Sequence, residues 1–68
     1  MAASWVKVYS ADQLFAAEMI KGMLEEENIE SVIMNKQDSA YGLFGEIEVY
    51  VDRDNVIQAL HIIQKHKA

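Results

Sequence analysis

The sequence predicts an α+β fold in which three strands and two helices follow one another in the order β-α-β-β-α. Three observations lead to this fold class. Residues 46–51 and 5–9 alternate between two kinds of side chain, as a strand with one covered face does. Residues 11–28 and 53–65 repeat apolar side chains at the spacing of an amphipathic helix. A chain of 68 residues has room for one core, so we expect a single domain over residues 4–66.

The first strand is expected at residues 5–9, which are rich in β-branched and aromatic side chains. Regular alternation along this strand places Val6 and Val8 on one face. It places Trp5, Lys7 and Tyr9 on the other.

The first helix is expected to begin near Ala11, because Ser10 and Gln13 have the spacing of a capping box. It should end near Asn28, a residue that tolerates the left-handed conformation of a helix C-terminus. Gly22 lies inside it, where glycine costs about 1 kcal/mol relative to alanine. Either another element or subunit approaches closely there, or Gly22 is a tolerated surface residue. The core face of this helix should consist of Ala16, Ala17, Ile20, Met23 and Leu24.

The second strand is expected at residues 29–35. Its apolar residues fall on both faces, a pattern typical of a strand that is covered on both sides. The third strand shows the clearest alternation in the chain, in which Glu46, Glu48 and Tyr50 are interleaved with apolar residues. Those apolar residues are Ile47, Val49 and Val51.

The second helix is expected at residues 53–65, and Asp52 has the right side chain to cap its N-terminus. Basic residues near its C-terminus, from Lys65 to Lys67, favour the negative end of the helix dipole. Its core face should consist of Val56, Ala59, Leu60 and Ile63.

The order of these elements predicts the topology. The first helix connects two strands by a crossover, and such crossovers join parallel strands with a right-handed connection. The third strand then fits between them, antiparallel to both, which gives the strand order 1-3-2 with both helices on one face. This is a ferredoxin-like unit that lacks its last strand. The other face and the edge of the first strand are left uncovered, which favours self-association. That open face is expected to carry Trp5, Lys7, Tyr9, Glu46, Glu48 and Tyr50.

Composition limits the classes of partner. The net charge of −5 and the pI near 4.7 disfavour binding to nucleic acid, which depends on basic residues. The apolar runs are far shorter than a membrane span, so we expect no membrane insertion. The absence of cysteine and of a secretory signal favours a cytoplasmic location.

No residue pattern indicates catalysis or a cofactor. His61 and His66 are five residues apart and fall on different faces of a helix, unlike a metal-binding pair. No serine stands in a nucleophile motif, and there is no thiol. Glu46 and Glu48 share a strand face, but alternating polar residues on an open face produce such pairs routinely. We therefore expect a protein that is not an enzyme and that needs neither metal nor cofactor.

The connection between the second and third strands holds large apolar side chains, and we expect a binding surface there. Tyr41, Leu43 and Phe44 follow Asp38 within a few residues. Together with Trp5, Tyr9 and Tyr50 of the open face, these residues are the candidate contacts for a partner or effector. The alternative is that the loop folds back and closes the end of the small core.

Nearly the whole chain, from Lys7 to His66, resembles a family of small prokaryotic signal-transducing proteins, a bacterial domain of unknown function. The segments that carry the resemblance are KVYS, AAEMIKGMLEEENI, NKQDSAYGLFGEIEVYV and the final helix. The resemblance implies a βαββα fold similar to the PII-type nitrogen regulators, with no assigned catalytic residue. It also implies that residues 36–45 occupy the position of the arm with which PII-type proteins contact their partners.

We therefore expect a regulatory or protein-interaction module that forms a homo-oligomer, either a dimer or a trimer, through its open sheet face or an edge strand. The alternative is a sensor of a small ligand or nucleotide that uses the loop between the second and third strands.

Overall fold

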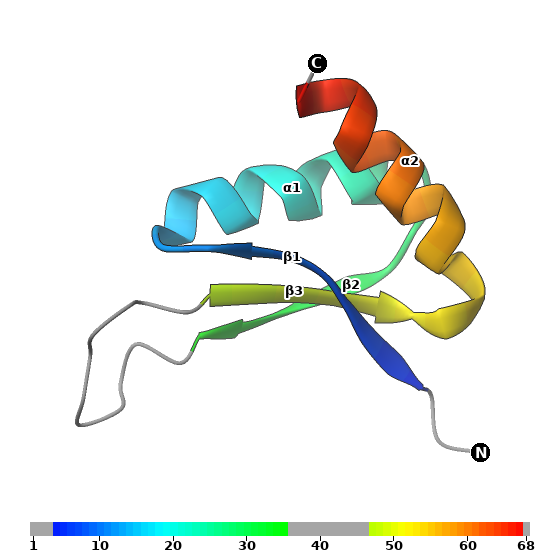
Figure 1. Ribbon diagram of the computed structural model, residues 1–68, viewed down its shortest axis with the longest axis horizontal. Coiled ribbons are helices and arrows are strands. Elements are labelled where there is room, and N and C mark those ends of the chain that lie inside the picture. Colours follow the sequence, from blue (N-terminus) through cyan, green and yellow to red (C-terminus); the bar gives the residue numbers. More distant parts are fainter. Residues whose placement is uncertain (1–3, 36–46, 68) are drawn as a thin grey trace.

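The computed structural model describes residues 4–35 and 47–67 and shows a ferredoxin-like α+β fold (Figure 1). The expected order of elements is confirmed. The elements are β1 (Trp5–Ala11), α1 (Leu14–Glu26), β2 (Ser31–Asn35), β3 (Ile47–Asp52), a short 3-10 helix η1 (Arg53–Asn55) and α2 (Val56–Lys67).

The three strands form one sheet in the predicted order β1-β3-β2, and β3 is antiparallel to both of its neighbours. Both helices lie on the same side of this sheet (Figure 1). The core lies between the two layers and consists, within the described residues, of apolar side chains that are at most 5% exposed. They are Ala17, Ile20 and Leu24 of α1, Ile29 in the connection from α1 to β2, then Ile47, Val49 and Val51 of β3, and finally Ala59 and Ile63 of α2.

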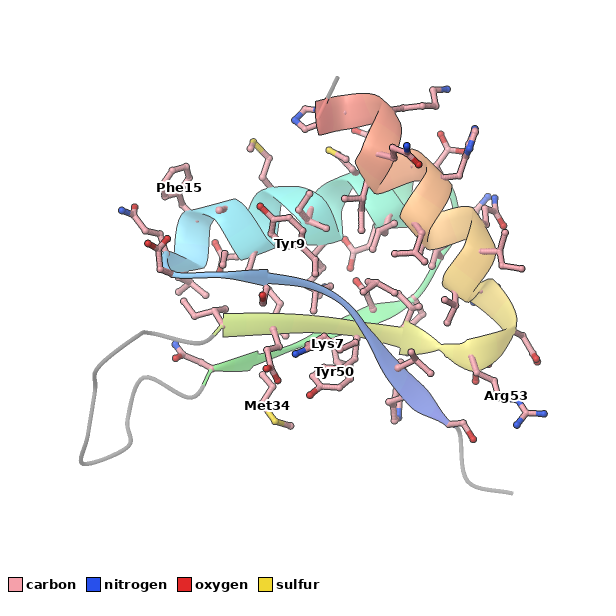
Figure 2. The ribbon with its side chains drawn as sticks, in the orientation of Figure 1. Lys7, Tyr9, Phe15, Met34, Tyr50 and Arg53 are labelled. Atoms are coloured by element: carbon pink, nitrogen blue, oxygen red, sulfur yellow. The ribbon has the colours of Figure 1, made fainter. Side chains whose placement is uncertain are left out.

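A β-bulge in β1 changes which face its residues occupy. Lys7 pairs with Tyr50 but Tyr9 pairs with Val49, so Val8 is the extra residue between them. Directly paired residues of antiparallel strands share a face, and Val49 belongs to the core. Tyr9 therefore packs against the core on the helix side, as Figure 2 also shows. The prediction that Tyr9 lies on the open face is wrong, because regular alternation takes no account of a bulge.

The start of α1 also differs from the prediction. Ser10 pairs with Glu48 inside β1, so the strand continues to Ala11 and the helix starts at Leu14. Gln13 is the N-cap residue, and it makes no side-chain capping hydrogen bond. Two additional backbone pairings of β1 with β3 thus replace the expected capping box.

The end of α1 agrees with the sequence. Asn28 has a φ of 65°, the left-handed conformation expected there. The amide of Ile29 donates to the carbonyl of Leu24, and the amide of Asn28 donates to that of Glu25, each at 2.9 Å. This is a Schellman motif, and its characteristic apolar contact is available because both Leu24 and Ile29 belong to the core.

β2 lies at the edge of the sheet and is not covered on both faces, contrary to the prediction. Val32 and Met34 are 39% and 49% exposed, whereas Ile33 packs against the core. The strand therefore has one covered and one bare face. The apolar side chains on its bare face are what gave the sequence the appearance of a strand buried on both sides.

The second helical segment begins as predicted, because Asp52 Oδ1 accepts a hydrogen bond from the amide of Asp54 at 2.9 Å. One 3-10 turn precedes α2. The core face of α2 includes Ala59 and Ile63, but Leu60 is 45% exposed, and Ile62 packs against the core in its place.

Candidate functional site

The candidate site is the side of the sheet that faces away from the helices, called here the open face. On this face Tyr50 of β3 pairs directly with Lys7 of β1 and with Val32 of β2. Two residues earlier along β3, Glu48 pairs with Met34 of β2. Figure 2 shows Lys7, Tyr50 and Met34 on this side of the sheet and Tyr9 on the other. The open face is defined by Trp5, Lys7, Val32, Met34, Glu48 and Tyr50.

A polar network centred on Glu48 lies in the middle of the open face. Lys7 Nζ lies 3.3 Å from Glu48 Oε2, and the Tyr50 hydroxyl donates to Glu48 Oε1 at 2.7 Å. Glu48 is only 4% exposed, although both described helices lie on the other side of the sheet. A carboxylate that is removed from water is stable only when it is paired and hydrogen-bonded, and Lys7 and Tyr50 supply both kinds of partner.

The network also changes the acidity of Tyr50. The hydrogen bond to Glu48 raises the pKa of Tyr50 above 10.0, because it stabilises the protonated hydroxyl. Partial burial and the negative charge of Glu48 raise this pKa further, and the charge of Lys7 opposes them. Tyr50 therefore remains a hydrogen-bond donor at all physiological pH values.

Exposed apolar side chains flank the network on both outer strands. Val32 and Met34 lie beside it on β2, and Trp5, which is 42% exposed, lies two residues from Lys7 on β1. Aromatic and large apolar side chains are enriched at the centres of protein interfaces. The arrangement therefore suits contact with another protein surface.

The structure does not bring Glu48 and His61 together. Glu48 lies on the open face, whereas the exposed His61 belongs to α2, which covers the opposite face. Glu46 lies outside the described residues. Within the residues that are described, no three side chains of the types that bind metals form a cluster.

The predicted site residues divide into three groups. Trp5 and Tyr50 lie on the open face as expected, and Tyr9 does not. Asp38, Tyr41, Leu43 and Phe44 lie outside the described residues, so the predicted loop site stays a prediction. Sequence reasoning missed two residues of the open face. These are Val32 and Met34, and the predicted strand order already contained the signal, since it places the second strand at an edge.

A second feature is a cleft of 310 Å³ between the C-terminal parts of the two helices. Met23 and Ile62 give it an apolar lining, and charged groups of opposite sign stand on its two walls. Glu26 is the last residue of α1 and Glu27 is its C-cap, and Lys65 and His66 come from α2. Within the described part of the chain, these four groups form no ion pair with one another.

Neither of the described helices combines the length and the apolar character needed to cross a membrane.

Comparison with known protein families gives a match over most of the chain. The model of the family DUF2007, whose description is "Putative prokaryotic signal transducing protein", matches residues 5–67. No curated protein and no solved structure matches the chain.

Proposed function

The chain belongs to this prokaryotic signal-transducing family, and from that premise we propose that it is a cytoplasmic, non-enzymatic signalling module that works by protein contact as a homo-oligomer. The observation that carries the proposal is the open face, where apolar side chains surround a paired carboxylate on the side of the sheet that faces away from both described helices.

The polar network makes contact with this face less costly. Burying an exposed carboxylate in an interface carries a large desolvation penalty. Glu48 is already 4% exposed and paired with Lys7, so an approaching surface does not have to remove water from it. The pair also contributes no net charge in a chain whose net charge is −5. A second copy of the chain can therefore approach this side without meeting a concentration of negative charge.

Photo-cross-linking in the living cell tests this proposal. A photoreactive amino acid is placed at Met34, which is 49% exposed on the open face, and in a separate variant at Ile57, which is 85% exposed on α2. The proposal predicts a cross-linked species at twice 7.7 kDa from the Met34 variant and much less from the Ile57 variant. Equal yields from both positions, or no homodimer from Met34, would contradict it.

Small-ligand sensing is a second candidate, and the cleft between the helices is the observation that favours it. Carboxylates on one wall and basic groups on the other match a small zwitterion such as an amino acid, with its ammonium toward Glu26 or Glu27. The sensor site that the sequence predicts, the loop at residues 36–45, lies outside the described residues. A thermal-shift panel of amino acids tests the cleft, since a ligand at 100 times its Kd stabilises the fold by about 2.7 kcal/mol. The Lys65→Met variant should lose that shift.

A further inference from the structure

We propose that two copies of the chain join through the outer edges of their β2 strands, antiparallel about a two-fold axis, to form one continuous six-stranded sheet. This inference rests on the proposed function, because it specifies how the homo-oligomer is built. It leaves the open faces of the two copies side by side on one enlarged surface.

The two edges of the sheet differ in how well they are protected against pairing. Natural edge strands are usually blocked by charged residues, proline or a bulge. β1 has both a lysine, Lys7, and the bulge at Val8. β2 contains no charged residue and no proline, and its register with β3 is regular from Ser31 to Asn35. In the part of the chain that the structure describes, β2 is therefore the edge that is open to another strand.

The side chains of β2 fit a second copy of the same strand. With the two-fold axis at Ile33, Val32 of one copy lies directly opposite Met34 of the other, on the open face. Both side chains are substantially exposed in the single chain. Cross-strand apolar pairs of this kind stabilise a sheet by roughly 0.2 to 1 kcal/mol each, in addition to the backbone hydrogen bonds. Pairing of β2 with itself thus covers the apolar side chains that the fold leaves bare at this edge.

The helix layer allows the same arrangement. α1 packs most extensively on β2, whereas α2 packs on β1 and β3. Since strands are about 4.8 Å apart, a helix lying over β2 and β3 comes to roughly 10 Å from its symmetry mate, the usual distance between packed helices. The two α1 helices would thus be neighbours without overlapping.

The flank of α1 that faces this neighbour carries charges of both signs. Met23 lines the cleft toward α2, and steps of about 100° per residue place Glu18, Lys21 and Glu25 on the opposite flank. Lys21 already pairs with Glu25 in its own helix. In the dimer each Lys21 also comes near the carboxylates of the other copy. Exposed ion pairs add little stability, so these charges select the antiparallel arrangement more than they strengthen it.

Amide hydrogen exchange on the full chain, resolved by residue at two protein concentrations, tests the proposal. Sedimentation first establishes the concentrations at which the chain is monomeric and associated. In the associated state the outward-facing amides of β2 should exchange at least about tenfold more slowly than in the monomer, and those of β1 should not change. The emission of Trp5, the only tryptophan, should also stay unchanged, because β1 is the far edge.

A pair of charge variants supplies the matched control. Val32→Lys places a charge on the pairing edge and should weaken association at least about tenfold, whereas Ile57→Lys places the same charge on exposed α2 and should have no effect.

Three results would overturn the proposal. Association with unprotected β2 amides and a blue-shifted Trp5 emission would mean that open faces stack on one another, and the proposed homo-oligomer would stand without this contact. Equal effects of the two lysine variants would also remove the β2 contact. A chain that stays monomeric would remove the homo-oligomer as well.

Discussion

At the scale of single residues, Glu48 shows how a bare sheet face can hold a buried charge. Its carboxylate accepts a hydrogen bond from Tyr50 and pairs with Lys7, and it is almost fully shielded from water. Removing one partner of such a pair leaves an uncompensated buried charge and costs far more than the pair itself contributes. The network therefore keeps the open face in one arrangement.

The raised pKa of Tyr50 gives the first residue-scale prediction. Folding favours the protonated hydroxyl, so this contribution to stability is present below pH 10 and is lost as the pH rises above 10 through the raised pKa. In Glu48→Ala both the hydrogen-bond acceptor and the negative charge that raise the pKa are gone, and the pKa of Tyr50 should fall toward its ordinary value. NMR titration of the Tyr50 ring measures its pKa in the native chain and in the variant. An unchanged pKa in the variant would show that Glu48 is not the cause.

Ser31 gives a second prediction at this scale. Its hydroxyl oxygen is buried and has no hydrogen-bond partner among the described residues. An unsatisfied buried polar group costs about 1 to 3 kcal/mol, so Ser31→Ala should leave the free energy of unfolding unchanged or raise it by about 1 kcal/mol. Urea denaturation measures the change, with the exposed Ser10→Ala as the control. A clear loss of stability in Ser31→Ala alone would reveal a partner for this hydroxyl.

At the scale of elements, the end of α1 and the start of α2 follow local rules that the sequence displays. Asn28 terminates α1 in the left-handed conformation, and Asp52 caps the turn that leads into α2. The start of α1 does not follow such a rule. Pairing of Ser10 with Glu48 on a distant strand outcompetes the local cap that Ser10 and Gln13 could form. Local signals are reliable where no distant partner competes for the same residues.

Gly22 supplies the element-scale prediction. Nothing lies within 4 Å of where its Cβ would be, so no other part of the described chain requires a glycine there. Gly22→Ala should therefore stabilise α1 and raise the free energy of unfolding by about 1 kcal/mol. Thermal and urea denaturation in dilute solution test this. If the substitution instead weakens association of the chain, a second copy approaches α1 at this position, and β2 is not the only contact.

At the scale of the whole molecule, the order β-α-β-β-α and the strand order 1-3-2 are predictable from the sequence. The strong alternation of residues 47–51 and the handedness of the crossover determine them. The open face is predictable only in part. Trp5 and Tyr50 follow from alternation, but Tyr9 depends on a bulge that no single residue marks. The exposure of Val32 and Met34 is not predictable from alternation, because an edge strand with apolar residues on both faces has the same sequence pattern as a buried strand.

The Lys7–Glu48 pair illustrates the same limit at the candidate site. The two residues are 41 positions apart, and only the register of β1 on β3 brings them together. Sequence patterns place each of them on the open face without showing that they meet. The pairing that leaves these two residues without net charge is therefore a result of tertiary structure.

Sedimentation equilibrium of the full chain over a wide range of concentrations tests self-association. If copies associate, the average mass should rise from 7.7 kDa toward twice that value as concentration increases. A mass that stays at 7.7 kDa up to millimolar concentration would contradict self-association.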